Sequence, residues 1–389
     1  MTIGFQKTPG RPVEITFDAD LGLPNDQQEL LLFGRAASGA TGVETVVTVN
    51  AVSDVTAATT EANTKFGAGS ELAKMVIAAV KANANAARST FPPIKCVPLA
   101  SNATEITTAA QTAAKQVKAE FIASPFDGST DATNRTTLKD LCAELSGAQR
   151  VENNQYGTIG VAANMSVADP ANLPSPDTQY LSLAWMRNSS PGALTVGEVA
   201  AAYAAVLAGN VSPFIPVDNY VIGGMSAPAL ADRISVGAGL ESETALGKGW
   251  TPIRTKPNEE VTIVRSVTSR ITTDGVVAAG AYYDVQDFQV LYFWRKTIFT
   301  RLNQPDLKNV KASEETAKQI KGELVRLASL FEDNEMFQAV AQLAKQFTVT
   351  RSVSDRHRFD VVTPVNVIPG LHVVATTVRA STQFDTVTI

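Results

Sequence analysis

The two histidines of the sequence are its first candidates for catalysis. A serine or cysteine nucleophile would need one of them as its base, and the chain holds only His357 and His372. His357 lies in the charged run 355–358, which is typical of a surface or interface ion network, and His372 lies in an apolar, strand-like run. Neither lies in the part that alternates strands with helices, where active sites of parallel sheets gather. We therefore expect no catalytic residues.

A short glycine-containing segment is the second candidate for chemistry. Residues 66–70 read Phe-Gly-Ala-Gly-Ser and precede an apolar pattern of helical period. Glycines ahead of a helix N-terminus can bind a phosphate group. The segment lacks the Lys-Ser/Thr ending of a P-loop and the third glycine of the dinucleotide fingerprint. A turn into a helix, at which glycine permits close packing, is the favoured interpretation.

Thiols and carboxylates are also poorly placed for chemistry. Cys96 and Cys142 lie in apolar segments and lack the paired spacing of zinc or redox sites, so we expect buried free thiols. With so few histidines, the sequence predicts neither a metal nor any other cofactor. The spacing of a calcium loop is absent from the acidic residues near expected turns, which are Asp127, Asp131, Asp274, Asp284 and Asp287.

Composition and charge exclude further classes of protein. The 389 residues are 44% hydrophobic and 18% charged, as in a folded chain that is long enough for two domains. The formal net charge of -5 offers no general attraction for nucleic acid or for anionic lipid. No apolar run approaches the roughly 18 residues of a membrane helix. We expect neither a nucleic acid nor a membrane as partner, and folding in a cytoplasm.

The last third of the chain could present a basic face. Residues 251–389 hold 17 Lys/Arg and 15 Asp/Glu, whereas residues 1–250 hold 16 and 23. Chance and solvated surface would produce the same asymmetry. An expected helix in this part carries lysines that form either a solvated face or a surface for an acidic partner; these are Lys308, Lys311, Lys318 and Lys321.

The pattern from about residue 42 to residue 209 predicts an α/β domain. Apolar, β-type runs alternate with apolar positions at helical spacing, as in parallel strands joined by helical crossovers. Thr195 and Glu198 form a capping box, and the helix that they begin should end at Gly209. The predicted strands are Val46–Val49, Ile94–Leu99, Phe121–Ala123, Gly157–Ala162 and Tyr180–Trp185, with helix faces at 72–80 and 138–145.

A different pattern follows Gly209. The stretch to about Lys256 is rich in Pro, Gly and Ser, so we expect an irregular connection with a domain boundary near residue 255. The fold class is thus α/β, doubly wound-like in residues 26–255 and mixed α+β in residues 256–373. The elements predicted in the second part are a strand at Val261–Thr268, a helix at Val285–Leu302, a helix capped by Ser313, and strands at Phe347–Val353 and Leu371–Val378.

Each end of the chain contains a strand-like alternation without an obvious local partner. Residues 1–25 and 374–389 could pair within their own subunit, or they could act as arms that add a strand to a neighbour's sheet. An exposed edge is costly to leave open, so some partner is expected in both cases. The candidate strand residues are Val13, Ile15 and Phe17 near the start and Val374, Thr376 and Val378 near the end.

Several segments, in order along most of the chain, resemble those of Mu-like contractile tail sheath proteins of the phage tail sheath family. Residues 66–75 resemble the family's segment of FGxGS followed by a helix. The charged run 355–360, with Pro364 after it, is similar to the family's turn before the final strand. The other similar segments are 95–99, 127–145, 219–224 and 261–268.

The resemblance implies a structural subunit that is not an enzyme. Members have an outer α/β domain and an inner C-terminal domain that grips the tail tube, and their terminal arms exchange strands with adjacent subunits. Here these would be residues 26–255, residues 256–373 and the two terminal segments. The resemblance gives the tube-facing domain but not its contact residues, and we take the lysine-bearing helix as the candidate. A helical polymer of hexameric rings would surround the tail tube protein, with baseplate and tail terminator proteins as further partners.

The implied activity is contraction, which would drive the tube through the host envelope for genome delivery without nucleotide hydrolysis. The subunit would belong to the virion tail after assembly in the host bacterial cytoplasm. Two alternatives stay open. The chain could be the sheath of a related injector, pyocin-like or secretion-like, or the strand and helix alternation could belong to an α/β hydrolase or a nucleotide-binding enzyme.

Overall fold

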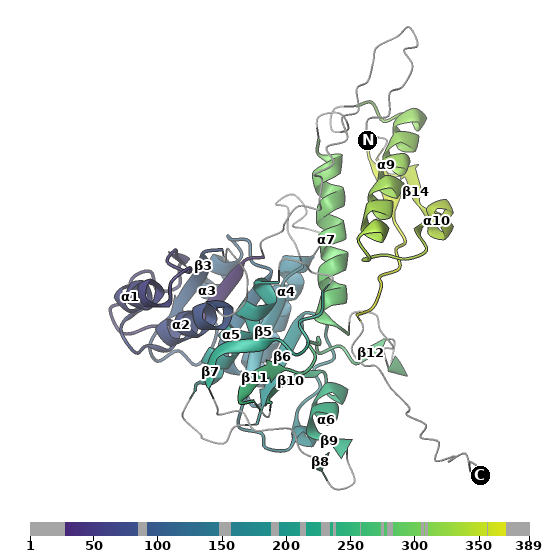
Figure 1. Cartoon of the computed structure of the whole chain (residues 1–389). Helices are drawn as coiled ribbons and strands as arrows, with labels where there is room; N and C mark the ends of the chain where they lie inside the picture. Colours follow the sequence, from purple (N-terminus) through teal and green to yellow (C-terminus); the bar gives the residue numbers. More distant parts are fainter. Residues whose placement is uncertain are drawn as a thin grey trace, which may run out of the picture.

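A computed structural model of the chain contains a large α/β part, called here the sheet unit, and a smaller C-terminal unit beside it (Figure 1). The mixed α/β fold class is therefore confirmed. The structure describes residues 28–84, 92–147, 157–187, 194–210, 215–226, 234–235, 239–256, 258–273, 276–277, 283–304, 307, 310–355 and 357–370.

Nine strands form one sheet in the order β2-β3-β1-β4-β5-β6-β10-β11-β7. Neighbouring strands from β3 to β10 are parallel, whereas β2, β11 and β7 pair antiparallel at the two ends of the sheet. The chain adds strands to one side of β1 and then to its other side, so the sheet is doubly wound about β1. The strands are β1 Leu30–Arg35, β2 Val47–Val49, β3 Ile94–Leu99, β4 Phe121–Asp127, β5 Ile159–Asn164, β6 Leu181–Met186, β7 Val221–Ser226, β10 Trp250–Thr255 and β11 Glu260–Ile263.

The central strand β1 has a core on each of its faces. Leu30 and Leu32 belong to one core and Leu31 to the other, because successive side chains of a strand point to opposite faces. All three side chains are buried. This strand is absent from the sequence-based predictions, since a short apolar run without alternation does not separate a buried strand from a buried helix.

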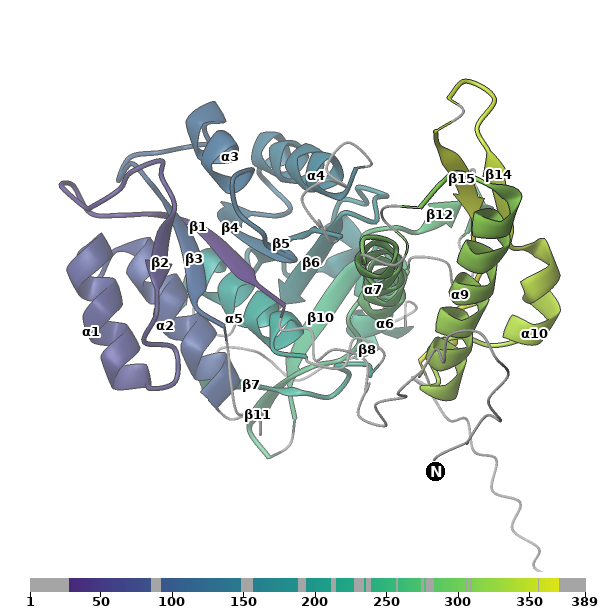
Figure 2. The ribbon, with the colours of Figure 1, turned by 90° about the horizontal axis from the view of Figure 1, so that it is seen from above.

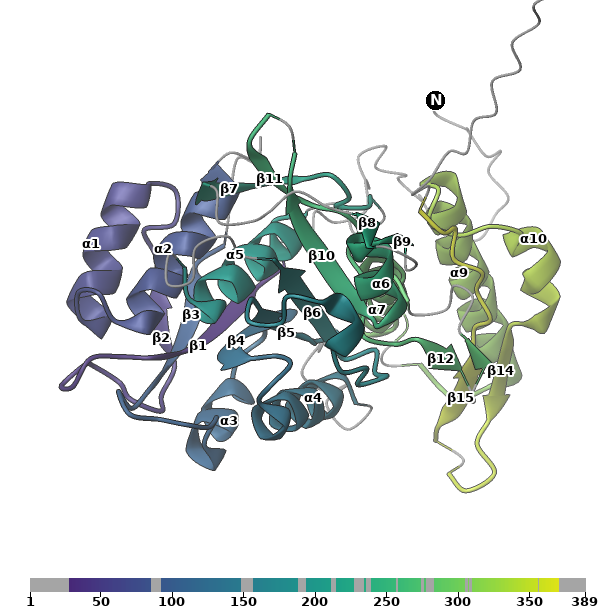
Figure 3. The ribbon, with the colours of Figure 1, turned by 90° about the horizontal axis from the view of Figure 1, so that it is seen from below.

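Helices cover both faces of the sheet. In Figures 2 and 3, α1, α2 and α5 lie on one side of the strands, and α3 and α4 lie on the other. The two apolar cores follow the same division, and the short α6 contributes Ala245 to the core that α3 and α4 share. The helices are α1 Val55–Phe66, α2 Glu71–Ala84, α3 Thr108–Ala114, α4 Ala132–Ser146, α5 Val196–Ala208 and α6 Glu241–Gly247, with a 3-10 turn η2 at Pro170–Asn172.

The alanine-rich α5 lies closest to the sheet. Its residues from Val199 onward are buried, and small side chains allow a close approach to α2 and to the strands. The predicted capping box is present, because Glu198 N donates to Thr195 Oγ1 at 3.2 Å and Thr195 N donates to Glu198 Oε2 at 2.7 Å. The helix ends at Gly209, as predicted. Among the described residues, no helix is both long and apolar enough to cross a membrane.

The C-terminal unit consists of two long helices and a short hairpin. The helix α7 spans Val285–Leu302 with the bounds that the sequence predicts, and α9, capped by Ser313, spans Glu314–Asp333. Aromatic side chains of both helices form the centre of its core. The remaining elements are α10 Val340–Leu343, a 3-10 turn η3 at Ala344–Gln346, and the paired strands β14 Thr348–Arg351 and β15 Phe359–Val362.

Three sequence-based expectations need correction. The stretch 209–256 is not an irregular connection, since it contains β7, α6 and β10; glycines in β7 and Pro252 in β10 hide their strand character. The strand predicted at Val261–Thr268 is the shorter β11 and belongs to the large sheet, which therefore continues past residue 255. The charged turn at 355–358 connects β14 to β15, a strand that was not predicted.

Small two-stranded sheets complete the structure. The pairs are β8 Ile234–Ser235 with β9 Gly239–Leu240, and β12 Thr272–Thr273 with β13 Val276–Val277. The strand expected at Leu371–Val378 lies outside the described residues.

Candidate functional site

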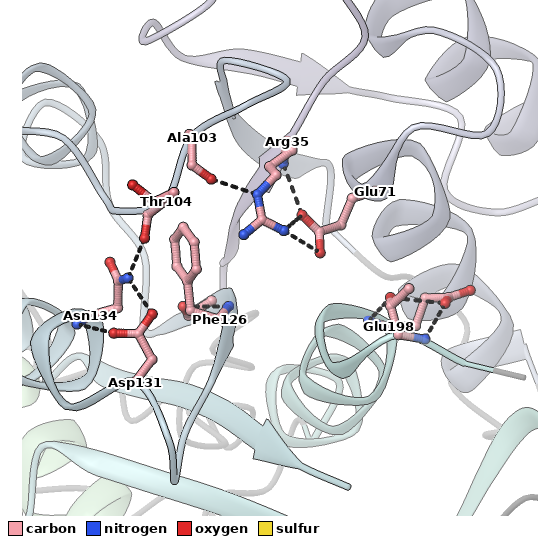
Figure 4. A network of polar contacts seen from close by, with 10 residues as sticks. Arg35, Glu71, Ala103, Thr104, Phe126, Asp131, Asn134 and Glu198 are labelled. Carbon is pink, nitrogen blue, oxygen red and sulfur yellow. Dashed lines mark hydrogen bonds and ion pairs between the residues drawn. The ribbon is translucent and has the colours of Figure 1, made fainter. Parts of the chain in front are cut away.

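The carboxyl edge of the parallel strands is the place where α/β proteins bind ligands, at the point where the strand order reverses. In this chain that point lies at the end of β1, where Arg35 is the last residue of the strand. The helices α2 and α5 begin near the same edge (Figure 4). A site for chemistry would therefore have to be built around Arg35.

Two nitrogens of the Arg35 guanidinium are bound by residues of its own chain. Its Nη1 lies 3.2 Å and 3.0 Å from the two carboxylate oxygens of Glu71, and its Nε donates to the carbonyl of Ala103 at 2.7 Å. Its central carbon lies 4.8 Å from the centroid of the Phe126 ring. Figure 4 shows the hydrogen bonds from Arg35 to Ala103 and Glu71, with Phe126 nearby. The charge of Arg35 is therefore paired with the Glu71 carboxylate, while 34% of the side chain stays exposed.

Carboxylates also occupy the two helix N-termini at this edge. Glu71 is the first residue of α2, and Glu198 caps α5 from within. Burial raises the pKa of the Glu71 carboxyl, Arg35 opposes this rise, and Glu198 adds to it. An acidic group therefore stands at each helix N-terminus where a phosphate would bind, and its charge opposes a second anion there. This arrangement disfavours a nucleotide.

The ends of the next strands are closed in the same manner. Asp127, at the end of β4, accepts hydrogen bonds from the backbone of Ser129 at 2.7 Å and from the buried amide of Asn164 at 3.0 Å and 2.9 Å. At the end of β6, Arg187 Nε lies 3.2 Å from the buried carboxylate of Glu241. Internal contacts therefore engage the polar side chains at the ends of β4 and β6.

A second polar network joins the loop after β3 to α4 (Figure 4). The side chain of Asn134 accepts from Ile106 N at 2.8 Å and donates to the Thr104 carbonyl at 2.8 Å. Asp131 caps α4 by accepting from Asn134 N at 3.0 Å. These contacts fix a loop and a helix end, and none of them pairs a nucleophile with a base.

Within the segment 66–70, Gly67 permits close packing, as the favoured interpretation holds. Gly67 ends α1 with a φ of 88°, and a Cβ atom at this position would lie 2.4 Å from the Cβ of Ala37. Gly69 also has a positive φ, of 74°. Only glycine fits Gly67 without moving the chain. The segment is therefore a tight turn between α1 and α2.

The thiols and the histidines form no reactive pair among the described residues. Cys96 and Cys142 are buried free cysteines, as predicted, and burial raises the pKa of both thiols. His357 is exposed in the turn after β14, where its backbone N donates to Asp355 Oδ1 at 2.8 Å. His372 lies outside the described residues. In the same part of the chain, no group of three or more metal-binding side chains comes together.

The C-terminal unit offers a different kind of candidate site, a surface for other protein chains. Lys318 lies one helical turn from Lys321 on α9, and Lys311 precedes the helix. Lys311 and Lys318 are exposed and Lys321 is half-buried, whereas Lys308 lies outside the described residues. The three lysines stand beside acidic residues, so the outer face of α9 carries charges of both signs.

The β14–β15 hairpin has edges that no other described strand covers. Three of its valines are exposed: Val361 at 36%, Val362 at 58%, and Val353, in the turn, completely. A two-stranded sheet with open edges and exposed apolar side chains can accept further strands. The six candidate strand residues of the chain ends, Val13, Ile15, Phe17, Val374, Thr376 and Val378, lie outside the described residues.

Sequence reasoning missed the closed carboxyl edge. Arg35 and Glu71 are 36 residues apart, and β1 itself was not predicted. An arginine directly after an apolar run, and a glutamate at the start of a helix, were the available signals. The hairpin edges were missed as well, because β15 was not predicted.

Comparison with known proteins gives no match by sequence but clear matches by structure. No protein-family model and no curated protein matches the chain. A chain of the anti-feeding prophage baseplate has 11% identity and a TM-score of 0.63, over 97% of this chain and 100% of that one. A sheath tail protein from Listeria innocua has 12% identity and a TM-score of 0.62, over 88% and 92%. The contracted helical sheath of the anti-feeding prophage has 13% identity and a TM-score of 0.58, over 98% and 100%.

Proposed function

We propose, from the fold of contractile sheath proteins that this chain has, that it is the structural subunit of a contractile sheath. It polymerises around a tail tube and contracts to drive the tube through a host envelope. The observation that carries this proposal is the extent of the likeness: sheath structures cover nearly the whole chain and are themselves covered nearly completely. Both units of the chain are therefore accounted for.

The closed carboxyl edge supports a role without catalysis. An α/β hydrolase or a nucleotide-binding enzyme needs an accessible group at this edge. Here Arg35, Glu71 and Asp127 are engaged by neighbouring residues of the same chain. We therefore favour a structural role over these enzymes.

The kind of contractile machine is a finer part of the proposal. The sequence segments favour a Mu-like phage tail, in which the subunit would belong to the virion and would be assembled in the host bacterial cytoplasm. Some of the similar solved structures come from the anti-feeding prophage and from an extracellular contractile injection system, which keeps a related injector as the alternative. Neighbouring genes for a capsid or for an injected toxin would separate the two.

Polymerisation through exchanged strands is supported by the hairpin of the C-terminal unit. Residues 1–25 and 374–389 are the proposed donors, and the open edges of β14 and β15 are the proposed acceptors. Backbone hydrogen bonds across an added strand depend little on side-chain identity, so flexible arms keep subunits connected while their other contacts change. The further partners in this proposal are the tail tube, baseplate and tail terminator proteins.

The proposal is tested by the behaviour of the purified protein. We expect electron microscopy of the overexpressed full chain to show hollow tubes with helical striation. A soluble protein that does not polymerise, imaged under the same conditions, would serve as the negative control. A protein that stays monomeric at high concentration, with both terminal segments protected from proteases, would contradict the proposal.

The lysines of α9 are the proposed contact to the tube. We expect the double change Lys318→Glu and Lys321→Glu to weaken co-assembly with the tube protein, because it reverses two charges on one helical turn. The native contact should weaken as salt rises, since exposed charges are screened over about 8–10 Å at ordinary ionic strength. Sedimentation of sheath with tube at several salt concentrations measures both effects.

A matched control lies on the sheet unit. Lys74 and Lys81 of α2 are exposed and also belong to one helix, so their reversal changes the net charge by the same amount. We expect this control to co-assemble as the native chain does. An equal loss of co-assembly in both double variants would show that α9 does not contact the tube. Co-assembly of the native chain that does not change with salt concentration would show the same.

A further inference from the structure

The helix α7 buries two different stripes of its surface. Val285, Phe288 and Tyr292 recur at helical spacing and pack with the core of the sheet unit. Phe293 and Trp294, on the other side, belong to the core of the C-terminal unit. Figure 2 shows α7 end-on between the strands and α9. Each unit therefore depends on the same helix for part of its core.

The stripe toward the sheet unit packs against a glycine, Gly157. A Cβ atom at Gly157 would lie 2.3 Å from the ring of Tyr292 and 2.6 Å from that of Phe288. The two rings lie 4.5 Å apart, centroid to centroid. Glycine at 157 thus lets both aromatic rings of α7 press against the start of β5.

Arg295 extends this contact to the end of α4. Its Nη1 donates to the carbonyl of Ser146 at 2.8 Å, and its Nη2 donates to that of Gly147 at 3.2 Å. These carbonyls belong to the last turn of a helix, where a cation is favoured by the helix dipole. One side chain of α7 therefore caps a helix of the sheet unit.

The stripe toward the C-terminal unit is aromatic. The Trp294 ring lies 5.1 Å from Phe331 of α9 and 5.3 Å from Phe337, and Phe293 lies 5.4 Å from Phe331. Val349 and Phe359 of the β14–β15 hairpin pack against the same core. The hairpin is thus fixed to α7 through one cluster of rings.

The chain also enters the described region beside α7. The Gln289 side chain donates to the Gln28 side-chain oxygen at 2.7 Å, and both residues are buried. Gln28 directly follows the terminal segment that contains the proposed N-terminal arm. The same helix therefore contacts both Gln28, where the arm leaves the described region, and the core that holds the acceptor hairpin. On α7 the two contacts, at Gln289 and Trp294, lie within two helical turns of each other.

We propose that α7 is a rigid strut that fixes the distance from the exit of the N-terminal arm to the acceptor hairpin. The inference rests on the proposed function for the meaning of the arm, but its geometry does not. Rotation of one unit against the other would expose one of the two stripes or break the helix. Changes in sheath length then fall on the arms between subunits.

The strut is tested on the full-length chain by electron-spin distance measurement, with the doubly labelled chain diluted in unlabelled chain so that only distances within one subunit are measured. Spin labels go on Thr136→Cys of α4 and Gln319→Cys of α9, both exposed positions, while the buried Cys96 and Cys142 stay unlabelled. We expect one narrow distance distribution in the otherwise native chain. The double change Tyr292→Ala and Arg295→Ala should broaden it at least twofold. Thr300→Ala, at an exposed position of α7, should leave it unchanged.

Two outcomes would count against the inference. A broad distribution in the native chain, or an equally narrow one in the Tyr292 and Arg295 variant, would overturn it. If that variant fails to fold by circular dichroism, Arg295→Lys replaces it, because lysine keeps the charge but cannot reach both carbonyls with one planar group. A native chain that never forms tubes would contradict the sheath function and leave the distance result standing.

Discussion

Removing residues 1–20, or residues 376–389, should leave a folded subunit that no longer polymerises. Neither deletion reaches the described cores, which begin at Leu30 and end at Val367. The proposed exchange of strands needs both arms, and each added strand supplies a row of backbone hydrogen bonds that no side-chain contact replaces. Thermal unfolding would establish that the variants are folded, and electron microscopy with sedimentation would measure polymer.

The two deletions control each other. Both should unfold at the temperature of the full chain, since each removes only a segment beyond the cores. Tubes of normal yield from either truncated chain would show that its missing arm is dispensable. A large drop in unfolding temperature would instead show that the segment pairs within its own subunit, which is the alternative that the sequence leaves open.

Phe331→Ala should cost the C-terminal unit about 3–5 kcal/mol of unfolding free energy, the usual range for removing a buried aromatic ring. The side chain is completely buried. Its ring contacts those of Trp294 and Phe337, with centroids 5.1 Å and 4.9 Å away. Such ring pairs add to the loss of buried area. Urea unfolding followed by tryptophan fluorescence would measure the change.

The three tryptophans make the result specific to one unit. Trp294 reports on the C-terminal core, whereas Trp185 and Trp250 belong to a core of the sheet unit. Val362→Ala, at a position 58% exposed on the hairpin, is the control and should change stability by about 0.5 kcal/mol or less. A loss below about 1 kcal/mol for Phe331→Ala would mean that the core collapses around the gap.

Elements with clear ends or strict apolar spacing could be predicted from the sequence. The strand Ile94–Leu99 and the helix Val285–Leu302 have the predicted bounds. The capping residues Thr195 and Ser313 accept the backbone hydrogen bonds expected of them. Local physics decides these cases, because a cap or a periodic stripe is encoded within a few residues.

Elements whose character depends on distant partners could not be predicted. The strand β1 is buried on both faces, so its apolar run shows no alternation. Pro252 is accepted in β10, where its carbonyl still accepts from Val264 N at 2.9 Å. The second buried stripe of α7 depends on the tertiary structure, because it packs against Gly157, which is far away in sequence. The pattern alone indicates an amphipathic helix with one face.

The candidate site followed the same rule. The absence of a triad could be argued from two histidines and their positions. The pairing of Arg35 with Glu71 required the tertiary structure, since 36 residues separate the two. The lysines of α9 could be named in advance, but only the structure shows that Lys321 is less exposed than Lys318.

The hairpin of β14 and β15 has two edges that no other strand covers within the described part of the chain, and the chain has two ends that could add strands there. In the proposed polymer, every interior subunit donates as many strands as it accepts. The numbers differ in the first and last rings of the polymer. Hairpin edges stay uncovered at one end, and terminal arms stay unpaired at the other. Growth therefore has a direction, and the two boundaries require chemically different closures.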